Sequence, residues 1–257
     1  LRAVKKPGGS ILRNAGLKTR QMGDRFGVCG TLFDNFSVRR CKVSIKAILW
    51  DLGDVVVPIS CSWPEIVEGV INGLDGVGSL SRAWFEHGGG KELLNNVESG
   101  LFTHERFWQE ASCAGGISTF DVVMASALFS SYLPLSLNVA HVLVELQKRY
   151  PLFAVSDGDF GSEFVVRSLF AHHAVAFKKV FISSKFGLKK PLLFGPVISF
   201  LQQKFGVEPE ECIFIDNKEG NVIDARNLGM SAFVFNITEG NSILLLLAGL
   251  RHAGVKI

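Results

Sequence analysis

Four short apolar segments of this 257-residue chain each lead into a residue that can take part in chemistry. The segments and the residues that follow them are Ile45–Trp50 with Asp51, Leu152–Val155 with Ser156 and Asp157, Val180–Ile182 with the loop to Lys190, and Cys212–Ile215 with Asp216. Short uninterrupted apolar runs are typical of strands buried in a parallel sheet, and open α/β sheets place their chemistry at the carboxyl ends of the strands. The sequence therefore predicts that two acids, a hydroxyl and an amine meet at one edge of a sheet.

Helical patterns separate these strands from residue 137 onward. The expected helices cover residues 138–149, 162–170, 194–205 and 221–228, and a last strand is expected at 232–235. Alternation of strands with helices indicates right-handed βαβ units. We therefore predict an α/β fold with a Rossmann-like parallel sheet flanked by helices.

The segment between the first two strands has a different pattern, because residues 60–133 contain no convincing strand. Helix starts are predicted at Ser62, where a capping-box pattern places proline in the first turn, at Thr103 and at Ser118. We therefore expect an all-helical cap inserted into the sheet domain. The predicted bounds are 1–44 for a basic leader, 45–59 with 137–257 for the core, and 60–136 for the cap.

Basic residues are concentrated at the start of the chain. Residues 1–44 hold ten Lys or Arg and two acids, a net charge of +8, whereas the remainder holds 17 basic and 22 acidic residues, a net charge of −5. An acid-poor basic segment is typical of an organelle transit peptide or of a disordered leader without an address, and both readings stay open. Because no aromatic stacking pattern accompanies it, we expect no nucleic-acid partner.

The cysteines and the apolar runs bear on the compartment. Five cysteines without C-x-x-C spacing argue against a disulfide framework and a zinc knuckle, and they favour a reducing compartment. The longest apolar run near the end of the chain, Ile243–Ala248, is far shorter than the ~20 residues that cross a bilayer. We expect a soluble protein without a membrane partner, in the cytoplasm, or in an organelle if residues 1–44 are a transit peptide.

The residue types at the predicted sheet edge suit phosphoryl transfer. An aspartate nucleophile needs no base, because a reference pKa of ~3.9 leaves it ionised at neutral pH. Repulsion from an anionic phosphate would be offset by a divalent cation bound to Asp51, Asp216 and a backbone carbonyl. Lys190 and the Ser156 hydroxyl would hold the phosphoryl oxygens. Each residue alone also fits a helix cap, a turn or an exposed basic pair, so the combination carries the prediction.

Four strings of the chain resemble, in order, the motifs of the haloacid dehalogenase-like (HAD) hydrolase superfamily, and the likeness spans about Ile45 to Glu239. They are DLGDVV at 51–56, FAVSDG at 153–158, SSKFGLKKP at 183–191 and CIFIDNKEGNV at 212–222. The helical-cap, phosphatase-like subgroup is the most similar in organisation. The resemblance implies a magnesium-dependent phosphatase that acts on a small phosphorylated metabolite through an aspartyl-phosphate.

The same resemblance assigns roles residue by residue. By this likeness the catalytic residues are Asp51, as nucleophile, and Lys190. The implied phosphate-binding residues are Ser156, Asp157 and Lys190, and the implied Mg²⁺ ligands are Asp51, Gly53 through its carbonyl, Asp216 and Asn217. Haloacid dehalogenation uses a similar aspartate without a metal, but the paired acids at 51 and 216 favour a cation.

Three positions depart from the family pattern. Gly53 stands where most of the phosphatases carry an aspartate that protonates the leaving group, and Asn217 stands where a second acid near the metal is usual. Asp157 stands where relatives often have asparagine and adds negative charge, while Asp54 is expected to be a turn residue or a supporting acid. These departures keep a second hypothesis open, in which the chain is a catalytically weak or inactive HAD-like protein that binds a ligand or a partner.

Other candidate features are weaker. The segment 87–91 lacks the spacing of a nucleotide-binding loop, and the pair His172-His173 has no ligand at metal-binding distance in sequence. No complete G-x-S-x-G elbow of a Ser-His-Asp hydrolase occurs. Lys189, next to Lys190, is expected on the solvent side.

Overall fold

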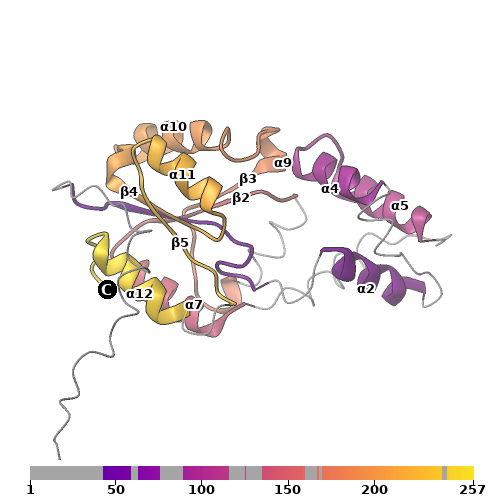
Figure 1. The fold of residues 1–257 in the computed structure, drawn as a ribbon, viewed down its shortest axis with the longest axis horizontal. Helices are drawn as coiled ribbons and strands as arrows, with labels where there is room; N and C mark the ends of the chain where they lie inside the picture. The colour runs from indigo at the N-terminus through magenta and orange to yellow at the C-terminus, as the bar shows by residue number, and fades with distance from the viewer. Residues whose placement is uncertain are drawn as a thin grey trace, which may run out of the picture. The chain divides into compact units, whose positions relative to one another are not determined.

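The computed structural model describes residues 43–58, 63–75, 89–115, 125, 135–159, 167, 170–238 and 242–257. These residues form one five-stranded sheet in which every pair of neighbouring strands is parallel, in the order β3-β2-β1-β4-β5 (Figure 1). The strands are β1 (Ala47–Trp50), β2 (Leu152–Ser156), β3 (Lys179–Ile182), β4 (Cys212–Asp216) and β5 (Ser231–Val234). The predicted α/β class and parallel sheet are confirmed.

Helices cover both faces of the sheet (Figure 1). On one face α10 (Phe194–Phe205) and α11 (Glu219–Asn227) pack against Ala47 and Leu49 of β1. On the other face α7 (Leu137–Leu146) and α12 (Ser242–His252) pack on the side of β1 that presents Ile48 and Trp50. Alternate residues of a strand point to opposite faces. Because both faces are buried, β1 reads as a continuous apolar run rather than as an alternating one.

The register of the central strand determines which polar residues meet. Trp50 lies opposite Ile215 of β4, and the backbone N–H of Asp51 donates to the Ile215 carbonyl at 2.8 Å. The next position of each strand is an aspartate, so Asp51 and Asp216 leave the sheet side by side. On the other side, Trp50 lies opposite Ala154, two residues before the end of β2 at Ser156.

The described residues between β1 and α7 form three helices, which we call the helical insertion. They are α2 (Trp63–Asp75), α4 (Gly90–Glu98) and α5 (His104–Ala114). The start predicted at Thr103 is confirmed, because its hydroxyl accepts a hydrogen bond from the Arg106 N–H at 3.1 Å. In α2, the apolar residues Ile66, Val67, Val70 and Ile71 are fully buried.

Some predicted elements change and others fall outside the described part of the chain. The sequence prediction missed α4, which begins at Gly90 in a glycine-rich stretch. It also missed the short α9 (Ser183–Phe186) and the 3₁₀ turn η1 (Pro209–Glu211). The leader through residue 42, the helix start expected at Ser118 and most of the helix expected at 162–170 are outside the described residues. No helix among the described residues is long and apolar enough to span a membrane.

Candidate active site

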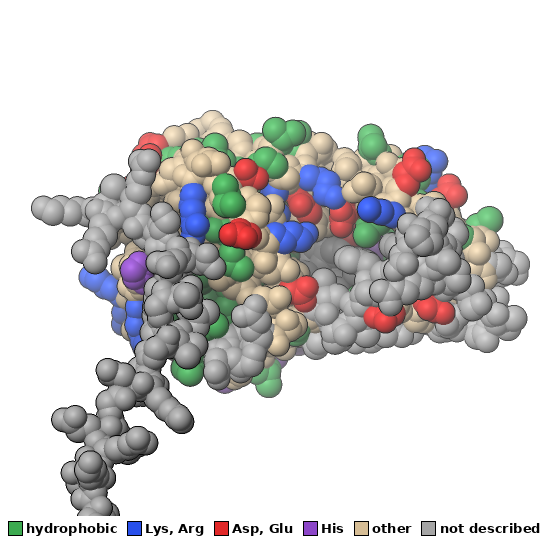
Figure 2. Space-filling view, in the orientation of Figure 1, with side chains coloured by type: hydrophobic (Ala, Val, Ile, Leu, Met, Phe, Trp, Pro, Cys, Tyr) green, Lys and Arg blue, Asp and Glu red, His purple; other side chains and the backbone are tan. Residues whose placement is uncertain are grey.

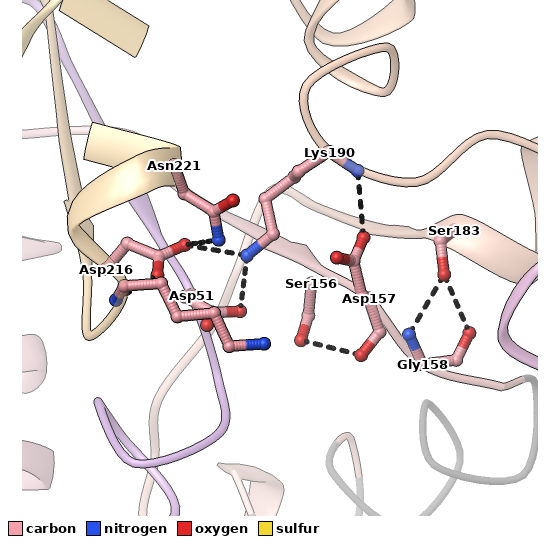
Figure 3. Close-up of polar contacts among 9 residues, drawn as sticks. Asp51, Ser156, Asp157, Gly158, Ser183, Lys190, Asp216 and Asn221 are labelled. Carbon is pink, nitrogen blue, oxygen red and sulfur yellow. Dashed lines mark hydrogen bonds and ion pairs between the residues drawn. The ribbon is translucent and has the colours of Figure 1, made fainter. Parts of the chain in front are cut away.

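A lysine joins two carboxylates at the carboxyl edge of the sheet (Figure 3). The Nζ of Lys190 lies 3.0 Å from Asp51 Oδ1 and 2.7 Å from Asp216 Oδ2. All three side chains are nearly excluded from water, with exposed fractions of 2% for Lys190, 8% for Asp51 and 0% for Asp216. Their juxtaposition matches the one that the strand ends predicted.

The electrostatics of this cluster are unbalanced, because one ammonium faces two carboxylates. Burial raises the pKa of Asp51; Lys190 opposes that effect and Asp216 adds to it. Burial lowers the pKa of Lys190, but Asp51, Asp216 and Asp157 outweigh it and raise the pKa to about 12. Lys190 is therefore protonated at neutral pH, and its single positive charge cannot balance two carboxylates when both are ionised.

Asp216 is held by three protein donors. Its Oδ1 accepts a hydrogen bond from the Lys218 N–H at 2.7 Å, and its Oδ2 accepts from Lys190 Nζ and, at 2.9 Å, from the Asn221 amide. A carboxylate has about four lone-pair directions, so one remains for another ligand. Sequence reasoning did not assign a role to Asn221. Asn221 lies in the first turn of the helix after β4, and this position alone could have indicated that its side chain is near Asp216.

The loops after β2 and β3 are joined beside this cluster (Figure 3). The backbone N–H of Lys190 donates to Asp157 Oδ1 at 3.0 Å, and the Gly158 N–H donates to the Ser183 hydroxyl at 3.0 Å. Ser156 ends β2 as a buried residue, and its hydroxyl contacts the Asp157 carbonyl at 3.5 Å. Asp157 thus supports the backbone that carries Lys190, a role that the sequence prediction of phosphate binding did not include.

Asp54 lies in a tight turn directly after β1. The N–H groups of Val55, Val56 and Val57 all point to the Leu52 carbonyl, and Asp54 has a left-handed φ of 56°. Aspartate tolerates this conformation better than most residues. The N–H of Asp54 bonds to the Val57 carbonyl, and its own carbonyl accepts from the Ile237 N–H. The segment is a tight turn, so the expected role as turn residue fits Asp54.

The described donors suit a hard divalent cation such as Mg²⁺. Two buried oxygens, Asp51 Oδ1 and Asn217 Oδ1, accept no hydrogen bond, although the former is within ion-pair distance of Lys190. Asp51 comes directly after β1 and Asn217 directly after β4, and these two strands are neighbours in the sheet. Oxygen ligands with net negative charge are what magnesium prefers. Among the described residues no group of three or more His, Cys, Asp or Glu forms a metal site, so an amide or backbone carbonyl has to complete the set.

The helical insertion reaches the loops that carry the cluster. Lys189 Nζ lies 2.5 Å from Glu98 Oε2 and 3.1 Å from Asn95 Oδ1, both on α4. Lys189 lies outside the buried cluster and is 33% exposed, but its ammonium pairs with α4 rather than with solvent alone. On α5, His104 Nδ1 makes a short contact with Asp159 Oδ2, while Trp108 Nε1 donates to His104 Nε2 at 3.1 Å.

Other surface features do not form a second site within the described part of the chain. His172 is exposed and His173 lies at the end of the helical turn that contains Phe170. Acidic and basic side chains alternate across the middle of the face in Figure 2 and do not gather into a patch of one sign.

Replacing Asp51 by asparagine is expected to raise the melting temperature by a few degrees at neutral pH, about 1 kcal/mol for a chain of this size. A raised pKa in the folded state means that ionised Asp51 opposes folding above its unfolded pKa. The gain should therefore shrink as the pH falls into the ordinary aspartate range. Thermal unfolding of both proteins near pH 7 and near pH 4 tests this, with Glu219→Gln, an exposed carboxylate, as the control. A lower melting temperature at both pH values would contradict it.

Comparison with known proteins adds a fold assignment. No protein-family model and no curated protein matches the chain. Among solved structures, a HAD family enzyme from Bacteroides thetaiotaomicron has a TM-score of 0.61 at 23% identity, over 79% of this chain and 98% of that chain. A predicted HAD-like family hydrolase from Porphyromonas gingivalis has a TM-score of 0.60 at 23% identity, over 80% and 98%. An L-2-haloacid dehalogenase has a TM-score of 0.53 at 16% identity, over 75% and 85%.

These matches span nearly the whole length of the first two neighbours. Identities below 25% speak to the fold and leave the chemistry open. Together with the sheet order and the helices on both faces, they confirm the fold that the resemblance of the four sequence strings implied. The chain has the HAD-like fold.

Proposed function

We propose that this chain is a magnesium-dependent phosphohydrolase that acts on a small phosphorylated metabolite, with Asp51 as the nucleophile. The observation that carries the proposal is the buried Lys190 ammonium between Asp51 and Asp216, at 3.0 and 2.7 Å. In this arrangement Lys190 favours the ionised form of Asp51 against the effect of burial, and a bound cation would favour that form further.

The residues act in two displacements. In the first, an Asp51 carboxylate oxygen bonds to phosphorus, the ester P–O bond breaks, and the leaving oxygen takes a proton from solvent. In the second, water attacks phosphorus, the bond to Asp51 breaks, and inorganic phosphate leaves with the carboxylate restored. Lys190 and the Ser156 hydroxyl hold phosphoryl oxygens in both steps. Asp51, Asp216, Asn217 and the Gly53 carbonyl would hold Mg²⁺, which when bound supplies Lewis-acid stabilisation of the phosphoryl charge.

The structural neighbours support the choice of substrate class. The Bacteroides thetaiotaomicron enzyme was also solved in complex with magnesium and inorganic phosphate, at 22% identity and a TM-score of 0.58 over 78% of this chain. Another neighbour is an L-2-haloacid dehalogenase. The pairing of Asp51 with a second buried acid favours the metal-dependent reaction for this chain.

The test is phosphate release from a panel of phosphate esters, with and without magnesium. Wild-type protein is expected to release phosphate only with magnesium, and Asp51→Asn is expected to release none, because an amide cannot form the acyl phosphate. Lys91→Ala, an exposed lysine on α4, is the control for a substitution outside the site. Equal release by wild type and Asp51→Asn would sink the assignment of the nucleophile.

A second candidate is a HAD-like protein that binds a phosphorylated ligand or a partner without turning it over. The observation that favours it is the turn after β1, where Gly53 offers no acid and Asp54 is fixed in a left-handed turn conformation. Asn217 in place of a second acid points the same way. Magnesium-independent binding of phosphate with no release from any ester in the panel would select this candidate.

A further inference from the structure

Two adjacent lysines of the loop after α9 point to different parts of the molecule. Lys190 enters the buried cluster, where its ammonium meets Asp51 and Asp216. Lys189 instead bonds to Glu98 and Asn95, which are about one turn apart on α4. Its side chain is 33% exposed and that of Glu98 is 15% exposed, so the pair is partly shielded from water. The side chains on both sides of the Lys189–Lys190 peptide bond are therefore held by ion pairs.

A second contact joins the same two segments. The Ser183 hydroxyl, which is fully buried, donates to the Glu98 carbonyl at 2.6 Å and accepts from the Gly158 N–H at 3.0 Å. Gly100 has a φ of 71°, and a side-chain carbon there would overlap the Ser184 carbonyl. The end of α4 is therefore seated directly on α9, and its close approach requires glycine.

A third contact reaches the loop after β2. His104 of α5 pairs with Asp159, two residues beyond the Asp157 carboxylate that accepts the Lys190 N–H. Because Trp108 Nε1 donates to His104 Nε2, that nitrogen is an acceptor, and the proton of the neutral ring resides on Nδ1, facing Asp159. This contact ties α5 to the loop that supports Lys190.

We propose that Glu98 and Lys189 are a positioning pair, through which the helical insertion fixes the backbone that aims Lys190 at Asp51 and Asp216. The pair does not touch the reacting atoms and acts through Lys190. A displacement of about 1 Å at a catalytic group can cost ~10²-fold in rate, so a loop fixed from outside the site has a direct effect on turnover. The kinetic part of this proposal rests on the proposed phosphatase function, whereas the structural part does not.

Hydrogen exchange of the full chain, followed by mass spectrometry, tests the structural part. The Lys190 N–H bond to Asp157 reports on the loop, and peptides covering residues 90–98 report on α4. Lys189→Ala and Glu98→Gln are each expected to speed exchange in both segments by about fivefold to tenfold, since either variant breaks the same pair. The double variant should exchange no faster than the single ones, because the coupling is already lost. Lys91→Ala on the same helix should exchange as wild type.

Kinetics test the link to Lys190. Lys189→Ala and Glu98→Gln are expected to lower kcat about tenfold with a smaller change in KM and an unchanged pH profile, since no titrating group of the reaction is removed. Unchanged exchange in the 183–191 loop of both variants would overturn the proposal, whatever the rates. Additive effects of the two substitutions on exchange would also overturn it. Absence of turnover in wild type with faster loop exchange in the variants would instead refute the phosphatase function and leave the positioning pair standing.

Discussion

Replacing Lys190 by alanine is expected to reduce phosphate release by about 10³-fold, the size seen when a preorganised charge-stabilising group is removed. The ammonium neutralises Asp51 and Asp216 at 3.0 and 2.7 Å, and without it two buried carboxylates repel both each other and the substrate. The same loss leaves buried charge uncompensated, so the free energy of unfolding should fall by about 3–5 kcal/mol. Initial rates and thermal unfolding on one preparation measure both effects.

The neighbouring lysine provides the matched comparison for this result. Lys189→Ala removes the same charge from the same loop, but its ammonium contacts Glu98 outside the cluster. We expect a loss about one hundred times smaller than that of Lys190→Ala, and little change in stability, because partly exposed pairs contribute ~0.2–1 kcal/mol. Equal and small effects of the two substitutions would show that the cluster does not depend on its cation, and the proposed mechanism would fail.

Introducing an acid in place of Gly53 is expected to speed hydrolysis of alkyl phosphates by about 10²-fold or more. An alkoxide leaving group needs a proton, and a positioned general acid typically contributes ~10²–10⁴-fold. Gly53 is not one of the described glycines with a positive φ, so its backbone accepts a side chain without the strain of a left-handed conformation. Rates of Gly53→Asp on an alkyl phosphate and on p-nitrophenyl phosphate, whose leaving group departs without a proton, measure the effect.

The control for this gain is Gly53→Asn, which has nearly the same size but no acidic proton. The acceleration should be confined to Gly53→Asp and to the alkyl ester. An equal gain on both esters, or in the asparagine variant, would show that the position acts through shape, and the reading of Gly53 as a missing acid would be withdrawn. Asp54 is left unchanged in both variants, because its backbone N–H and carbonyl are bonded to Val57 and Ile237 in the same turn.

Local patterns were sufficient to predict the sheet and the meeting of its polar strand ends. The strands lie within two residues of the predicted bounds, because short apolar runs buried on both faces have few other structures open to them. Parallel strands end at the same edge of a sheet, so the meeting of Asp51, Lys190 and Asp216 followed from the predicted alternation of strands and helices. Their ion pairs confirm the predicted juxtaposition, while their catalytic roles remain proposals.

Contacts between segments far apart in the sequence could not be predicted from local patterns. Glu98 and Lys189 are 91 residues apart, and His104 and Asp159 are 55 residues apart, with no shared pattern in the sequence. Each alone has the composition of an exposed helix or loop, so only the docking of the insertion brings them together. Helix α4 was missed for a local reason, since its first residue, Gly90, belongs to a glycine-rich stretch that favours a connection.

The order of the strands in the sheet also bears on how the molecule is made. β1 occupies the centre, and Ile48 pairs with Leu152 on one side and with Ile213 on the other. Since chains are synthesised from the N-terminus, the most apolar strand leaves the ribosome long before either partner exists, and such long-range parallel pairing folds slowly. Asp51 and Asp216 therefore become neighbours only after most of the chain has been translated. A chain released before β4 has been synthesised would leave one edge of β1 unpaired and open to aggregation or to binding by chaperones.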